Sequence, residues 1–132
     1  MSIGKWRYRA NAISLQEYLQ LEMPESGIKG RSELTDTVTV RIIESDTLLL
    51  YAQVARHQGG YYSGTIYETP TGGALCGVYK LGSPNSKVGA LKQVIRREMD
   101  NSYVTNHPGN MGKLKAALEN MSLLENVQLT LF

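Results

Sequence analysis

The sequence predicts an α+β fold, in which a four-stranded antiparallel meander carries one short N-terminal helix and two C-terminal helices packed on one face. Apolar and polar residues alternate between Asp36 and Leu81, which is the period of half-buried strands. From Val88 onward, apolar residues recur every three or four positions, which is the period of amphipathic helices. A run of strands followed by a run of helices indicates that the helices cover one face of a sheet.

The N-terminal elements are expected to be short. Residues 5–9 alternate basic and aromatic side chains, which favours a strand with both aromatic residues on one face. Ser14 and Glu17 form a capping-box pattern, so we expect a helix of about two turns to begin there. Residues 22–36 contain proline, glycine and several serine and glutamate residues, and we expect a surface loop.

Turn sequences divide the alternating region into strands. The turns lie at Ser45-Asp46, at residues 57–60 and at residues 69–73. The strands that they separate are expected near residues 38–42, 48–54, 61–67 and 75–81. Short turns between consecutive strands indicate an antiparallel meander.

Two longer helices follow the sheet. The first carries its apolar residues at Val88, Leu91, Val94, Ile95 and Met99. A break at residues 107–109 precedes the second, which Asn110 is expected to cap. Its expected buried residues are Met111, Leu114, Leu118 and Met121. We expect residues 1–126 to form a single domain and residues 127–132 a C-terminal tail.

Length and composition restrict the class of protein. A chain of 132 residues with 42% hydrophobic residues is long enough for one domain with a real core. No apolar run approaches the length of a membrane span, and the basic start lacks the apolar stretch of a signal peptide. One cysteine excludes an internal disulfide, and we expect a cytoplasmic protein without membrane association. Seven bases against two acids in residues 80–115 predict a moderately basic surface there.

The sequence offers little for catalysis. His57 and His107 are the two histidines, and both lie in turns where we expect surface residues. Cys76 lies in the middle of an expected strand, where burial is the ordinary explanation of a small thiol. Glu44 and Asp46 flank one turn, but a catalytic metal site needs further carboxylates nearby. We therefore expect no enzyme, no metal site and no cofactor.

Tyrosines on the expected meander suggest a second function, the binding of single-stranded DNA or RNA. Tyr61 and Tyr67 share one face of a strand, and on the face without helices they would stack on bases. The arrangement resembles, in topology only, the small single-strand-binding folds of the transcription-coactivator and Pur type. The candidate contacts are Tyr61, Tyr67, Arg41, Arg56, Lys92, Arg96 and Arg97. In the alternative explanation, these tyrosines are ordinary strand residues that point into the core.

The chain ends in Gln128-Leu129-Thr130-Leu131-Phe132. This segment resembles the bacterial sliding-clamp-binding pentapeptide, usually Gln-Leu-Ser/Asp-Leu-Phe, which is found at chain ends of polymerases and repair proteins. The resemblance covers five of 132 residues, and it departs from the usual form only at the tolerant third position. It implies that Leu131 and Phe132 fill a hydrophobic cleft of the clamp, that Leu129 supports them and that Gln128 sets the register.

The resemblance implies a non-enzymatic accessory or inhibitory protein of bacterial or phage DNA replication or repair. Large apolar anchors in preformed pockets are an effective way for a short peptide to bind. Two alternatives remain open. The alternation of Val127, Leu129 and Leu131 also fits a final strand at the sheet edge. A phage anti-defence protein could instead inhibit a host protein through some other surface.

Overall fold

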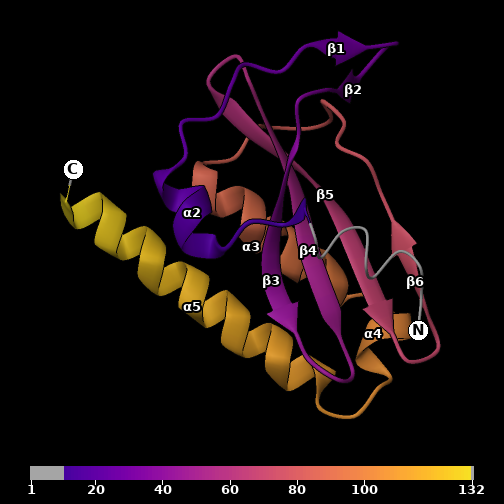
Figure 1. The fold of residues 1–132 in the computed structure, drawn as a ribbon. Helices are drawn as coiled ribbons and strands as arrows, with labels where there is room; N and C mark the ends of the chain where they lie inside the picture. The colour runs from indigo at the N-terminus through magenta and orange to yellow at the C-terminus, as the bar shows by residue number, and fades with distance from the viewer. Residues whose placement is uncertain (1–10, 132) are drawn as a thin grey trace.

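The structure, a computed structural model, describes the backbone of residues 11–131 and the side chains of residues 11–126. It confirms the α+β prediction, with a four-stranded antiparallel sheet in the order β3-β4-β5-β6 (Figure 1). The strand bounds are Val38–Glu44, Leu49–His57, Gly60–Thr69 and Gly72–Leu75. The strand expected at residues 5–9 lies outside the described residues.

The β4–β5 hairpin turns where its sequence predicts. Gln58 and Gly59 have φ values of 52° and 79° between the paired residues His57 and Gly60. Two positive φ values in a two-residue loop are those of a type I′ turn, which matches the twist of the flanking strands. The longer β3–β4 turn closes with a hydrogen bond from the Ser45 N–H to the Leu48 oxygen.

Two helices cover one face of the sheet, which we call the inner face. Helix α3 (Lys87–Met99) packs on β4 and β5, and α5 (Asn110–Leu131) packs on α3 and reaches β3 (Figure 1). The core between these layers consists mainly of aliphatic side chains from both, including Val40, Leu50, Val54, Leu91, Ile95 and Leu114. The short helix α2 (Leu15–Gln20) lies beside β3 and begins with the expected capping box of Ser14 and Glu17.

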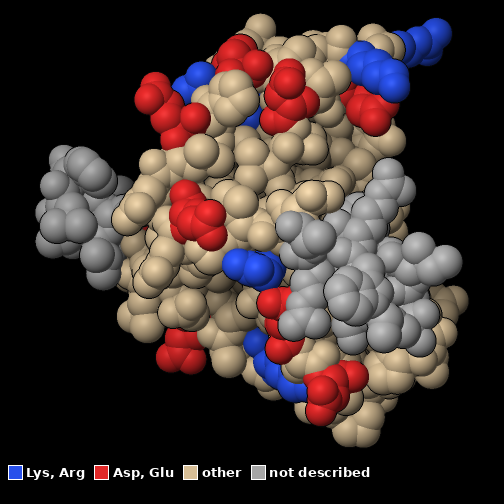
Figure 2. Space-filling model, viewed as in Figure 1, with Lys and Arg blue, Asp and Glu red and all other residues tan. Residues whose placement is uncertain are grey.

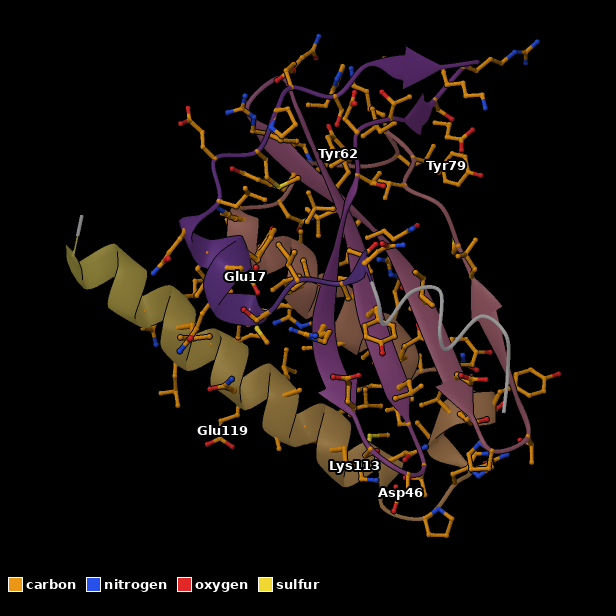
Figure 3. The ribbon with its side chains drawn as sticks, viewed as in Figure 1. Glu17, Asp46, Tyr62, Tyr79, Lys113 and Glu119 are labelled. Atoms are coloured by element: carbon orange, nitrogen blue, oxygen red, sulfur yellow. The ribbon has the colours of Figure 1, made fainter. Side chains whose placement is uncertain are left out.

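A short helix that the sequence pattern did not indicate, α4 (Ser102–Thr105), joins α3 to α5. Helix α5 begins at Asn110, where we expected a cap, but the Asn110 side chain has another role. It is buried, and its Nδ2 donates to the backbone oxygens of Thr47 and Val104 at 3.0 and 2.9 Å. Lys113 Nζ donates to Ser45 Oγ at 2.9 Å. Figure 3 shows Lys113 close to Asp46, which belongs to the same turn. These bonds fasten the start of α5 to the β3–β4 turn.

The opposite face, which we call the outer face, is partly covered by a small second layer. It contains strands β1 (Ile28–Lys29) and β2 (Glu33–Leu34), which pair with each other. Leu34 donates its N–H to the Val78 oxygen, and Lys80 donates to the Ser32 oxygen, so residues 78–80 extend this layer. Leu34 and Val78 pack on Ala55 and Tyr62 of the outer face.

This second layer corrects two predictions. Residues 22–36 are not simply a surface loop, because Ser26 and Leu34 are buried and Met23 is buried in the inner-face core. The last strand does not extend over residues 75–81: β6 ends at Leu75, and the chain then crosses the outer face over Gly64. A Cβ atom at Gly64 would lie 2.6 Å from the Gly77 oxygen and would also collide with the Cys76 oxygen. Glycine is therefore required at the crossing point.

Two of the residues considered for catalysis also differ from expectation. Cys76 is exposed, because it directly follows the edge strand β6, whose four residues are also exposed. His57 is buried, because residues 25–26 of the second layer pack beside the end of β4. Burial of a side chain depends on such long-range packing, which the local pattern at Cys76 and His57 does not contain.

Candidate functional site

The end of α5 is the candidate site that the sequence singles out. The backbone of residues 127–131 continues α5, so the alternative in which Val127, Leu129 and Leu131 form an edge strand is wrong. Phe132 and the side chains of Gln128, Leu129 and Leu131 lie outside the part of the chain that the structure describes. The C-terminal end of α5 extends past α2, beyond the edge of the sheet (Figure 1).

Glu125, near the end of the part of α5 whose side chains the structure describes, links this helix to the first half of α3. Its Oε1 accepts from Lys92 Nζ at 3.1 Å, and its Oε2 accepts from the hydroxyl of Ser86 at 3.2 Å. Ser86 is the N-cap of α3, and a carboxylate near a helix N-terminus is favoured by the helix dipole. One turn earlier, Met121 is buried in the core. The candidate pentapeptide thus begins three residues beyond a firmly attached position.

The basic residues of α3 have structural partners. Lys92 forms the ion pair with Glu125 that is described above. Arg97 Nη2 donates to the backbone oxygen and the hydroxyl of Ser63 at 3.1 and 2.8 Å. Burial lowers the pKa of Arg97, while the neighbouring Cys76 and Glu98 oppose this shift. Arg96 and Arg97 are both exposed residues of this helix, and Arg96 is the one of the three predicted basic contacts for which the structure describes no hydrogen bond or ion pair.

The other predicted nucleic-acid contacts are divided between the two faces of the sheet, because Arg56 lies opposite Tyr61 on the inner face and Arg41 lies on the outer face. Tyr61 and Tyr67 are partly buried against the inner-face core, on the side that the helices cover. Arg41 is paired with Tyr51, whose side chain belongs to an outer-face cluster, and its ion pair with Glu44 spans 4.0 Å. The open stacking platform that the tyrosine hypothesis requires is therefore missing from these positions. Figure 2 shows acidic and basic side chains interspersed on the visible face rather than a continuous basic stripe.

A buried polar cluster that the sequence pattern did not reveal joins the second layer to the end of β4. His57 Nδ1 lies 2.9 Å from the Ser26 oxygen, and Glu25 lies 3.9 Å from Arg56 Nε. Ser26 Oγ, Arg56 Nε and His57 Nε2 are buried without a hydrogen-bond partner. Because these atoms are inaccessible to solvent, we interpret the cluster as a structural contact. No local signal marks it, since residues 25–26 lie in a segment with loop composition.

Within the described residues, no cluster of three or more histidine, cysteine, aspartate or glutamate side chains is placed to hold a metal ion. No helix in residues 11–131 is both long and apolar enough to cross a membrane. No family model, curated protein or solved structure matches this chain. The end of α5 therefore remains the feature with the most specific chemical signal.

Proposed function

We propose that this protein binds the bacterial sliding clamp through Gln128–Phe132 and acts as an accessory or inhibitory protein of bacterial or phage DNA metabolism. The observation that supports this proposal is the position of the pentapeptide. It follows Glu125, the residue that fastens α5 to α3, at the end of a helix that extends past the sheet (Figure 1). A clamp can approach such a helix end without disturbing the core.

The anchors explain how so short a segment would bind. Leu131 and Phe132 are the two apolar side chains that end the chain, and burial of each in a pocket contributes roughly 1.5–3 kcal/mol. Binding of an extended peptide requires the last turn of α5 to unwind. This costs little, because the ends of helices fray.

Single-strand binding has less support, because Lys92 and Arg97 are engaged within the fold and the two tyrosines face the helices. The anti-defence hypothesis stays a prediction, since no described surface favours a particular host protein. Clamp binding is accordingly the function that we propose.

The test is a titration of purified bacterial clamp with the full chain and with a chain that lacks Gln128–Phe132. We expect micromolar or tighter binding by the full chain and none by the shortened one. Phe132→Ala should weaken binding by roughly 2 kcal/mol, or about 30-fold, if it is a pocket anchor. Leu123→Ala is the matched control, because Leu123 is an exposed apolar residue of the same helix outside the pentapeptide. Equal binding by the full and shortened chains would contradict the proposal.

A further inference from the structure

We propose that the outer edge of β6 pairs with the same edge of a second copy of this chain, in an antiparallel register centred on Ala74. β6 is the end strand of the main sheet, and within residues 11–131 no strand pairs with its far edge. All four residues of β6 are exposed (Figure 1 shows the strand at the margin of the sheet). An open strand edge presents N–H and C=O groups that can pair with another strand.

The two edges of the sheet differ in how they are protected. The β3 edge has a β-bulge between Arg41 and Ile43, and Ile13 covers its middle. Ile13 donates to the Thr39 oxygen at 2.8 Å and accepts from the Arg41 N–H at 3.0 Å. β6, with the sequence Gly-Gly-Ala-Leu, has no charge, no proline and no described bulge. Charges, prolines and bulges are among the features that prevent edge pairing, and within the described residues β6 has none of the three.

The hydrogen-bond pattern shows which groups of β6 are directed outward. The Cys76 N–H donates to the Thr65 oxygen at 2.8 Å, just beyond the end of the strand. In an antiparallel pair, successive residues alternate between facing the partner strand and facing away from it. Ala74 therefore faces β5 with its N–H and C=O groups, whereas Gly73 and Leu75 direct theirs away from the sheet.

A second copy fits these groups. With Ala74 on the two-fold axis, Gly73 lies opposite Leu75 of the other copy, and the outward N–H and C=O groups of both residues find partners. Leu75, of which 52% is exposed, would then cover the second copy's glycine, which has no side chain to obstruct it. Since β6 is uncharged, no like charges face each other across the axis. A four-residue contact is small, so we expect a weak, concentration-dependent dimer.

Sedimentation equilibrium over protein concentrations from about 10 μM to about 1 mM tests this proposal. The average mass should rise from 14.6 kDa toward twice that value. Ala74→Lys and Ala74→Glu place like charges opposite each other, and each should weaken association at least about tenfold. An equimolar mixture of the two variants should restore it, because the two charges then attract. Leu81→Lys is the matched control, since Leu81 is 70% exposed but lies outside β6.

A mass of 14.6 kDa at every concentration would overturn the proposal. So would unchanged association of Ala74→Lys, or a mixture that stays monomeric. Amide hydrogen exchange shows whether something other than a second copy pairs with the edge of β6. If the amides of Gly73 and Leu75 were protected from exchange in a monomer, a segment of the same chain would pair with β6, and this too would overturn the proposal. Circular dichroism establishes that the variants fold. The dimer does not depend on clamp binding, so the chain that lacks Gln128–Phe132 should associate like the full chain.

Discussion

Arg97 of α3 closes a gap in the main sheet by donating to both the backbone oxygen and the hydroxyl of Ser63, at 3.1 and 2.8 Å. The gap arises because the chain leaves β5 after the Cys76–Thr65 hydrogen bond, while Asn85 pairs with β5 only at Tyr61. Ser63 lies between these two points. The guanidinium group thus stabilises a sheet edge, and this use competes with any role of Arg97 in binding nucleic acid.

The first prediction follows from this contact. Arg97→Ala should lower the free energy of unfolding by roughly 1–3 kcal/mol, because a buried backbone oxygen loses a charged donor. Arg96→Ala is the matched control, since its side chain is exposed on the same turn of α3, and it should change stability by less than about 0.5 kcal/mol. Urea unfolding of the two variants measures the difference. Equal stabilities would mean that the Ser63 contact contributes nothing.

The second prediction concerns the crossing of residues 76–77 over β5. Gly64→Ala should destabilise the protein by roughly 2 kcal/mol or more, because its methyl group would meet the backbone oxygens of Cys76 and Gly77. Gly112→Ala in α5 is the control: a Cβ there meets nothing within 4 Å, and alanine is the better helix former. This control should raise stability by about 0.5–1 kcal/mol. If thermal unfolding showed Gly64→Ala to be as stable as the parent, the crossing would be placed wrongly.

The contrast between these two glycines illustrates what the sequence could reveal. The strands β3, β4 and β5 and helices α3 and α5 were predictable, because each has an apolar stripe of regular period and a recognisable start or turn. The path of residues 76–81 was not predictable, because their alternation fits a strand in the main sheet equally well. The chain instead pairs with the second layer, and the crossing depends on the absence of a side chain at Gly64.

The candidate site shows the same limit. The C-terminal pentapeptide was recognisable because its signal is local and independent of the fold. The grouping of tyrosines and arginines into one surface depended on which sheet face the helices cover, and the alternation of Tyr61 and Tyr67 is the same in either case. The structure places both on the helix-covered face. The Glu125 contact with Ser86 and Lys92 joins two helices across more than thirty positions, so no local pattern could indicate it.

A third prediction uses the buried carboxyl group of Glu98, which is 6% exposed and accepts from Asn101 Nδ2 at 2.9 Å. Burial raises its pKa above the usual 4.5, although the bond from Asn101 and the charge of Arg97 oppose this. The folded state therefore favours the protonated form. The stability that this group contributes is fully present below pH 4.5 and is lost as the pH rises through the raised pKa.

Glu98→Gln should accordingly make the protein more stable than the parent at neutral pH, with no difference below about pH 4. Glutamine keeps an acceptor for Asn101 and carries no charge that must be buried. Glu119→Gln is the control on an exposed face of α5, where Glu119 points away from the sheet, and it should show no such pH-dependent gain (Figure 3). Urea midpoints of the three proteins between pH 3.5 and 8 give the comparison. A variant that is less stable than the parent at pH 7 would show that the Glu98 charge is favourable.

The last prediction tests whether the C-terminal residues are available to a partner. Met121 and Glu125 attach α5 to the core and to α3, so a chain that ends at Asn126 should retain its stability to within about 0.5 kcal/mol. Glu125→Ala should cost more, roughly 1 kcal/mol, because it removes a charged acceptor from both Lys92 and the N-cap Ser86. Thermal unfolding of both variants beside the parent measures these effects. If the chain that ends at Asn126 were less stable than Glu125→Ala, residues 127–132 would be packed on the rest of the protein. A clamp would then have to compete with that packing, and binding through Leu131 and Phe132 would be weakened by the same free energy.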